Sequence, residues 1–351
     1  MVESLGTNPR SNTPERIRGT LAALGAAVLF GASAPAAKVL LSEASPVMLA
    51  AILYLGAGLG LTGLRFAIGN RRREASLRRE DGPLLLGLIA AGGVVAPLLL
   101  LAGLARVSAT SGSLLLNLEG PLTAILAVVY FGEHLGGRAA GGCIAMMMGA
   151  ATLALAPGMH VAPDPLGMLA IVGACSGWAI DNNLTSRLSL RDPFALAQIK
   201  GLAGGSTALA IAFATGHSVP PPSIAFAGLL IGFASYGVSL ALAIYAMRAI
   251  GVAREAALFS AAPFLGVLLS VGWLHEPFGL RELIALVSMA LGVWFLATER
   301  HSHRHTHATV DHDHRHTHDA HHQHGHAIGD PTGEPHAHPH THAPLEHEHP
   351  H

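Results

Sequence analysis

The sequence contains few charged residues. Only 12% of its 351 residues are Asp, Glu, Lys or Arg, whereas soluble proteins average about 25%. The charges are also unevenly spread, because residues 1–18, 70–81 and 299–351 hold 24 of the 43. The rest of the chain has too few to solvate the surface of a globular protein. This excludes an ordinary cytosolic enzyme, a nucleic-acid binder and a disordered scaffold.

Cysteines and catalytic motifs are scarce as well. The two cysteines, Cys143 and Cys175, lie inside apolar runs, so we do not expect a structural disulfide. His275 and Glu276 begin a string typical of zinc proteases, but Gly279 stands where the second histidine ligand would be. The sequence has no Gly-Lys-Ser/Thr phosphate loop and so no sign of ATP hydrolysis. We therefore expect a protein that is not an enzyme and requires no cofactor.

Long apolar runs are the main feature of the chain. A helix needs about 20 apolar residues to cross the ~30 Å hydrocarbon core of a bilayer. Ten such runs are separated by short connections, and they cover residues 19–41, 46–67, 83–104, 107–131, 138–156, 166–187, 193–215, 223–247, 252–274 and 279–298. The sequence therefore predicts an all-α polytopic membrane protein with ten transmembrane helices in the lipid bilayer.

Positive charge is divided unequally between the two ends of these spans. If the N-terminus lies inside, 17 Lys and Arg residues fall at the inner ends, and only Lys38, Arg106 and Arg281 fall at the outer ends. Basic residues accumulate on the cytoplasmic side of membrane proteins. We therefore expect a multi-pass protein of the plasma (inner) membrane with both termini in the cytoplasm.

Two parts of the sequence repeat the same landmarks in the same order. Residues 104–150 and 246–293 match at a spacing of 142 or 143, pairing Arg106 with Arg248, Pro121 with Pro263, Glu133 with Glu276, and Gly149 with Gly292. Five spans per unit would place the two copies upside down relative to each other, as in secondary transporters. Chance similarity between apolar helices is the alternative. The predicted organisation is an N-terminal segment 1–18, repeats 19–156 and 166–298, and a tail 299–351.

Three sets of residues resemble those of a known family. They are FGASAPAAK at residues 30–38, the proline helices around Pro121 and Pro263, and the helix ends FGEHL at 131–135 and LHEPF at 274–278. The pattern resembles the EamA family of the drug/metabolite transporter (DMT) superfamily over residues 19–298. The resemblance implies ten helices in two repeats around a central cavity, and a transporter, often an exporter, of small metabolites. Span 2 lacks the arginine that many relatives carry there, which allows for different binding chemistry.

Ionisable groups in a bilayer are costly and usually face a cavity or a partner. Asp181, Asn182 and Asn183 lie in the sixth span, and Lys200 lies about two turns into the seventh. We expect an Asp181–Lys200 ion pair that serves as a substrate or proton-coupling site, with the two asparagines as hydrogen-bonding groups. The alternatives are a structural ion pair, or a lysine that reaches the cytoplasmic surface.

A second polar group lies in the fourth span. Asn117 and Glu119 precede Pro121, and a proline frees a backbone carbonyl one turn earlier. Pro121 and its counterpart Pro263 are therefore hinge candidates. Glu119 is a candidate for proton coupling, because an apolar environment favours the neutral form of a carboxyl group. The alternative is a carboxylate that neighbouring serines or backbone groups hold in place.

Other polar and aromatic residues have ordinary explanations. We expect Lys38 to reach the outer interface, and Glu133 and Glu276 to cap the fifth and tenth spans. Trp178 and Tyr236 could line a cavity, but buried or interfacial aromatic residues are common in membrane proteins.

The tail is rich in histidine. It holds 19 of the 23 histidines, mostly as alternating His-x-His, and has few aliphatic residues, so we expect it to be disordered. Such a density of imidazoles should bind Zn²⁺, Ni²⁺, Co²⁺ or Cu²⁺. The candidate ligands are His301, His303, His305, His307, His312, His314, His316, His318, His336, His338, His340 and His342. A metal collector, a sensor, a store, a pH-responsive polycation and an extension with no role in transport all remain open.

Two functions follow from these observations. The first is a secondary transporter that exports a small organic metabolite by alternating access. The alternative is a Ni, Co or Zn exporter that the tail feeds or regulates, although the spans offer few metal ligands. A metal-storage or sensory protein without transport is a third class. Small-residue pairs such as Gly56 and Gly60 allow for a homodimer, but they are too common to imply one.

Overall fold

The structure is a computed structural model. It describes residues 13–68, 77–132, 135–154, 164–188, 191–298, 302–307, 310–316, 336–342 and 345–350. Residues 13–298 are helical apart from the connections, and strands occur only after residue 301 within the described ranges.

The helices of the first repeat follow the predicted spans closely, and three spans are built from more than one segment. They are α1 (Thr13–Gly31) with α2 (Ser33–Leu40); α3 (Pro46–Ile68); α4 (Gly82–Leu88), preceded by η1 (Arg79–Asp81) and continued by the π-helix η2 (Ile89–Val95) and α5 (Ala96–Leu104); α6 (Ala109–Leu115), the 3₁₀ turn η3 (Leu116–Leu118) and α7 (Glu119–Phe131); and α8 (Gly137–Ala154).

The second repeat has five spans in the same order, but its first span is a single helix. They are α9 (Pro165–Ser186); α10 (Pro193–Ala214); α11 (Pro222–Gly232), the π-helix η4 (Phe233–Val238) and α12 (Ser239–Ile250); α13 (Val252–Phe259) with α14 (Ala262–Gly272); and α15 (Leu280–Ala297). Two of these helices begin with an aspartate before a proline, since Asp164 and Asp192 accept the first backbone N–H groups of α9 and α10. The backbone N–H of Gly167 in particular holds the pKa of Asp164 below its usual value.

Eight of these helical stretches within the described residues are long and apolar enough to cross a membrane. The other two predicted spans correspond to α8 and α9, helices of 18 and 22 residues. Glycines in α8 and the polar run Asp181–Asn183 in α9 lower the apolar character of these helices. The structure thus confirms an all-helical membrane fold and eight of the ten predicted spans.

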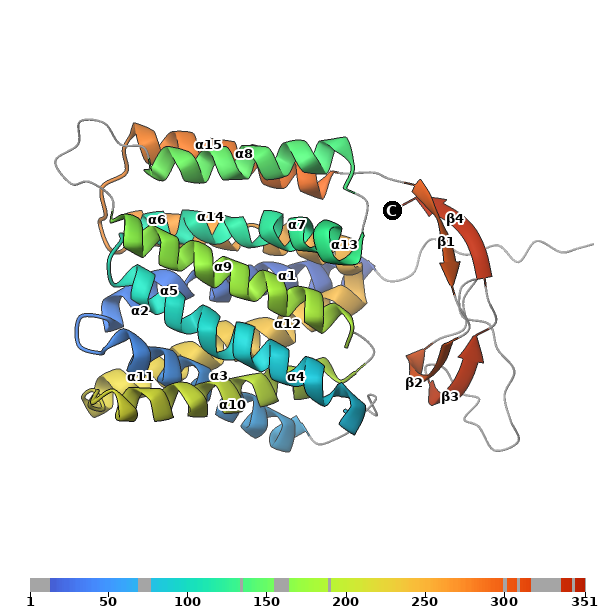
Figure 1. The fold of residues 1–351 in the computed structure, drawn as a ribbon, viewed down its shortest axis with the longest axis horizontal. Helices are drawn as coiled ribbons and strands as arrows, with labels where there is room; N and C mark the ends of the chain where they lie inside the picture. The colour runs from blue at the N-terminus through green and yellow to red at the C-terminus, as the bar shows by residue number, and fades with distance from the viewer. Residues whose placement is uncertain are drawn as a thin grey trace, which may run out of the picture.

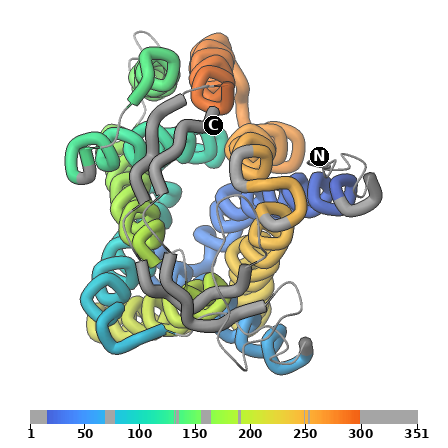
Figure 2. The backbone as a smooth tube through the Cα atoms, turned by 90° about the vertical axis from the view of Figure 1, so that its right-hand side faces the viewer, coloured from blue at the N-terminus to red at the C-terminus, as the bar shows by residue number. Residues whose placement is uncertain are grey.

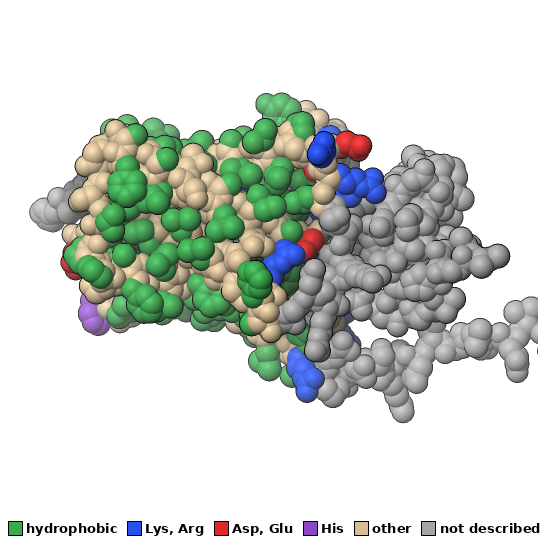
Figure 3. Space-filling model, turned by 90° about the horizontal axis from the view of Figure 1, so that it is seen from below, with side chains coloured by type: hydrophobic (Ala, Val, Ile, Leu, Met, Phe, Trp, Pro, Cys, Tyr) green, Lys and Arg blue, Asp and Glu red, His purple; other side chains and the backbone are tan. Residues whose placement is uncertain are grey.

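The spans lie side by side with their long axes aligned, and α8 and α15 form a separate pair along one edge (Figure 1). We call the end where α1 begins and α15 ends the termini end, and the opposite end the far end. Seen from the termini end, the helices form a ring (Figure 2). Apolar side chains cover the body, and Lys and Arg side chains gather at the termini end (Figure 3).

The packing of the helices shows the inverted repeat. Helix α1 packs on α12, and its counterpart α9 packs on α5. Likewise α3 packs on η4, and its counterpart α10 packs on η2. Residues 143 positions apart meet where the repeats cross: Ser288 Oγ donates to the backbone oxygen of Ala145 at 2.7 Å, and a Cβ on Gly201 would lie 2.8 Å from the nitrogen of Gly58. The two repeats therefore have opposite orientations, as predicted.

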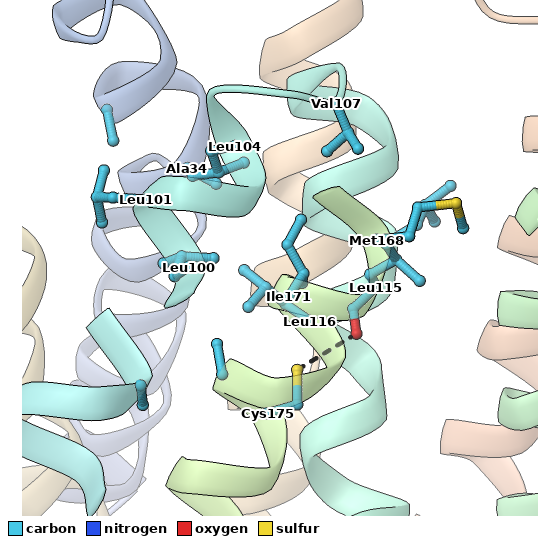
Figure 4. Close-up of a cluster of buried hydrophobic side chains, with 14 of the residues drawn as sticks. Ala34, Leu100, Leu101, Leu104, Val107, Leu115, Leu116, Met168, Ile171 and Cys175 are labelled. Atoms are coloured by element: carbon cyan, nitrogen blue, oxygen red, sulfur yellow. Dashed lines mark hydrogen bonds between the residues drawn. The ribbon is translucent and has the colours of Figure 1, made fainter. Parts of the chain in front are cut away.

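The largest apolar cluster joins α2, α5, α6 and α9 between the two repeats (Figure 4). Leu104, Leu115 and Ile171 are each at most 1% exposed. Because lipid is as apolar as leucine, close packing and not escape from water holds these helices together. Cys175 lies in this cluster and its Sγ donates to the oxygen of Leu115 at 3.5 Å, and both cysteines are free, as expected.

The described parts of the tail form strands where the composition predicted disorder. Strand β1 (Ser302–His307) pairs antiparallel with β4 (Leu345–Pro350), and β2 (Val310–His316) pairs with β3 (His336–His342). The alternation His-x-His has the two-residue period of a strand. Five registered pairs join two histidine positions: 303 with 349, 305 with 347, 312 with 340, 314 with 338, and 316 with 336. Sheets of only two strands are marginally stable in water.

Candidate functional site

A cavity of about 250 Å³ lies between the two repeats. Its wall comes from α1, α3, α7, α9, α10, η4, α12 and α13. The cavity extends from the middle of the bundle toward the termini end, since Asn182 lies near the end of α9 and Ala197 near the start of α10.

The predicted ion pair lies in this wall. Lys200 Nζ is 2.6 Å from Asp181 Oδ2. The side chain of Asp181 is 4% exposed and that of Lys200 is 27% exposed. The carboxylate of the pair is therefore buried, while the lysine is partly open to the cavity. A Cβ on Gly92 would lie 2.3 Å from Asp181 Cγ. Only glycine at position 92 therefore allows Asp181 to take this place.

Beside this pair, the π-helix η2 leaves one backbone oxygen, that of Gly92, without an N–H partner in its own helix. The N–H of Ala96 donates to the oxygen of Ala91, five residues back, and Pro97 has no N–H for the oxygen of Gly92. Tyr54 Oη donates to that oxygen at 2.9 Å, and Trp178 Nε1 lies 3.3 Å from it. The Gly-Gly-x-x-x-Pro sequence thus widens the helix and fixes two aromatic side chains. Such π-helical turns are frequent at functional sites.

Glu119 lies on the other side of Asn182. Asn182 Nδ2 donates to Glu119 Oε1 at 2.8 Å. Glu119 is the first residue of α7 and follows the turn η3, so the break before Pro121 brings its side chain to the cavity. Both residues also line a groove of about 430 Å³ between α7 and α9. Glu119 is therefore reached from two sides.

The remaining residues predicted for the site lie outside the cavity wall. Asn183 donates to the backbone oxygens of Thr123 and Ala179 and lines the groove. Asn117 is buried in η3 and donates to the oxygen of Leu114, away from the residues that line the cavity. Pro121 and Pro263 each follow an interruption of their span, which fits a hinge.

Aromatic rings line the same cavity as these polar groups. The rings of Tyr54 and Tyr236 are 5.8 Å apart, and Phe30 lies 5.9 Å from Tyr236 and 5.2 Å from Phe259. Trp178 also lines the cavity. Of these residues, the sequence suggested only Trp178 and Tyr236. Phe30 stood out only as the first residue of the FGASAPAAK motif, and Tyr54 and Phe259 belonged to no motif that would distinguish them from lipid-facing residues.

Two charged side chains join separate segments at the far end. Lys38 Nζ donates to the oxygens of Leu104 and Val107 at 2.6 and 2.7 Å. The Glu276 carboxylate accepts from the backbone nitrogens of Ala109 and Thr110 at 2.8 and 2.7 Å. We call these contacts the far-end latch. It ties α2 and the loop between α14 and α15 to the turn between α5 and α6.

The latch corrects two expectations from the sequence. Lys38 binds two backbone oxygens inside the protein instead of only reaching the interface. Glu276 caps α6 and not the tenth span, where Glu282 accepts from the N–H of Gly279. The reason is that Glu276 lies on a loop that crosses to the other repeat, which spacing along the chain does not reveal. Glu133 lies outside the described residues.

Comparisons with known proteins agree with this architecture. The model of the EamA-like transporter family matches residues 17–155 and 165–298. A relative from Methanothermobacter thermautotrophicus (strain ATCC 29096 / DSM 1053 / JCM 10044 / NBRC 100330 / Delta H), described as an uncharacterized transporter, is 31% identical over 300 residues, with 80% of this chain and 86% of that protein covered. A solved crystal structure of a protein has a TM-score of 0.60 at 20% identity, over 80% of this chain and 98% of the other. That last likeness shows the fold alone.

Two inverted helical repeats around a cavity within the membrane, together with the family match, define a multi-pass membrane transporter. The chain belongs to the EamA-like transporter family, and through it to the drug/metabolite transporter superfamily.

Proposed function

We propose that this transporter exports a small organic solute across the plasma membrane by alternating access. The main observation is the asymmetry between the two ends: the cavity reaches toward the termini end, while the far-end latch joins the spans at the other. Inverted repeats provide two equivalent gates around one site in the middle of the membrane.

The direction follows from the distribution of charge. Basic side chains gather at the termini end (Figure 3), which the positive-inside rule assigns to the cytoplasm. The cavity is then loaded from the cytoplasm, as an exporter requires. The cavity volume of about 250 Å³ is below the 300–1,000 Å³ of sites for drug-sized ligands and favours a small solute. A carboxylate in the wall, Glu119 or Asp181, is the candidate for proton coupling.

The alternative is a divalent-metal exporter that the tail feeds or regulates. The register of the tail strands places histidine positions opposite each other, which favours binding of Zn²⁺, Ni²⁺, Co²⁺ or Cu²⁺ there. The membrane body offers less support, because the described residues contain no group of three or more His, Cys, Asp or Glu that could hold a metal ion. We therefore favour the organic solute and assign the tail a buffering or sensing role.

One experiment separates the two. Cells with the full chain, with a chain ending at residue 300, and with neither are challenged with Ni²⁺, Co²⁺ and Zn²⁺, and cell metal and excreted metabolites are measured. An organic-solute exporter keeps its excretion after tail deletion. Lower cell metal that depends on residues 301–351 would establish the metal exporter instead.

A further inference from the structure

The charges of the cavity wall do not balance among the described residues. Glu119 and Asp181 are carboxylates, and Lys200 is the ammonium group among the described residues that line the cavity. Lys200 is committed to Asp181 at 2.6 Å, whereas Glu119 is held by the uncharged amide of Asn182. One carboxyl group therefore remains without a positive partner in this wall.

The hydrogen bonds of the wall favour a ligand that donates. Several donors in the wall are bonded to protein acceptors: Lys200 to Asp181, Asn182 to Glu119, Tyr54 to Gly92, and Ser239 to Ala26. Asp181 Oδ1, in contrast, is buried and has no hydrogen-bond partner among the described residues. The wall thus has an acceptor available for a ligand that brings its own N–H groups. An ammonium group carries three donors and no acceptor.

Aromatic rings in the same cavity wall suit this ligand. Phe30 lies 5.9 Å from Tyr236 and 5.2 Å from Phe259, and Tyr54 lies 5.8 Å from Tyr236, in edge-on or tilted arrangements. The faces of aromatic rings attract cations and pack against apolar groups. We propose that the cavity selects a small organic monocation, a protonated amine on an aromatic ring or short apolar chain, with its ammonium group between Glu119 and Asp181. This rests on the proposed function, because it takes the cavity as the substrate site.

The test uses four probes that share a phenyl ring and differ in charge. Phenethylamine is a cation, phenethyl alcohol is neutral, 3-phenylpropionate is an anion and phenylalanine is a zwitterion. Equilibrium dialysis of the tritiated probes against the full chain in lipid nanodiscs gives their affinities. We expect phenethylamine to bind at least tenfold tighter than each of the other three.

Two variants locate the effect. Glu119→Gln should weaken phenethylamine at least tenfold and leave phenethyl alcohol within twofold, a difference that general misfolding would not produce. Glu255→Gln, a buried carboxyl in α13 outside the cavity wall, is the matched control and should change neither. Tighter binding of the anion or the zwitterion, no binding of any probe, or an equal loss in both variants would overturn the inference.

Transport is measured separately, so that the two proposals can fail independently. In proteoliposomes, phenethylamine that binds but is not moved would contradict the transport proposal and leave the cation site intact. Movement of 3-phenylpropionate or phenylalanine in preference to phenethylamine would support transport and contradict the cation site.

Discussion

The two repeats share a backbone but differ in the chemistry they bring to the cavity. Position 57 in α3 is Ala, and position 200, 143 residues later in α10, is Lys, yet both line the cavity. Tyr54 and Ala197 form a second such pair. The second repeat thus supplies the ion pair, while the first supplies a tyrosine and Glu119 to the same cavity.

This difference distinguishes positions that serve the packing of the two repeats from positions that serve the cavity. Where the repeats cross, both copies need small residues, as Gly58 and Gly201 show, because a Cβ on either would meet backbone atoms of the other helix. Around the cavity the copies have diverged, because a solute without twofold symmetry is best matched by unlike walls. Five changes test this comparison.

Making position 200 like its counterpart should have the largest effect. Lys200→Ala leaves the buried Asp181 carboxylate without its cation, and breaking a buried pair in this way costs about 3 kcal/mol. The midpoint of thermal unfolding in detergent should fall accordingly. The double variant Asp181→Asn with Lys200→Ala should recover much of the loss, and a double variant no more stable than Lys200→Ala would contradict the pairing.

Opening the far-end latch should have the next largest effect. Glu276→Ala removes a carboxylate that accepts from the N–H groups of Ala109 and Thr110, at a cost of about 2 kcal/mol for hydrogen bonds to a charged group. Hydrogen exchange of these two amides should become faster. The exposed Glu43 at the same end is the control, and Glu43→Ala should leave their exchange unchanged.

The counterpart of Glu276 by sequence is Glu133. The variant Glu133→Ala therefore tests whether the two ends of the molecule act separately. If the two ends are equivalent gates, this variant should leave exchange at Ala109 and Thr110 unchanged while it destabilises the termini end. Faster exchange at the far end in both variants would mean that the ends do not act separately.

Gly92→Ala gives the first repeat a side chain at a place where the second repeat has one, since Ser235 stands 143 residues later. The added Cβ would collide with Asp181, and such overpacking costs about 1.5 kcal/mol. Gly63 in α3 has open space around it, so Gly63→Ala should be neutral or slightly stabilising. Equal unfolding midpoints for the two variants would show that Asp181 does not need the glycine.

Tyr54→Phe should have the smallest effect. It removes only the hydroxyl that donates to the oxygen of Gly92, worth about 1 kcal/mol. Tyr130 is 74% exposed, so Tyr130→Phe should leave the unfolding midpoint unchanged. A Tyr54→Phe variant as stable as Tyr130→Phe would remove the support for a fixed aromatic side chain beside the π-helix.

Much of the site could be predicted because polar residues are rare in apolar spans. Asp181, Asn182, Lys200 and Glu119 stand out for that reason, and the structure places all four at one cavity. Asn117 stood out equally, but it bonds to its own helix, which composition cannot distinguish from a role in the cavity. Phe30 and Phe259 were overlooked because an apolar side chain has the same sequence signal whether it faces lipid or a cavity.

The sequence by itself determined the membrane class, the spans and the inverted repeat. Length and apolarity set which segments can cross the bilayer, and matched landmarks set their symmetry. Only the tertiary structure decided that Gly92 makes room for Asp181, that Glu276 caps α6 across the repeats, and that the aromatic rings line the same cavity as Glu119. These relations depend on distances between segments far apart in the chain, and close packing of helices fixes those distances.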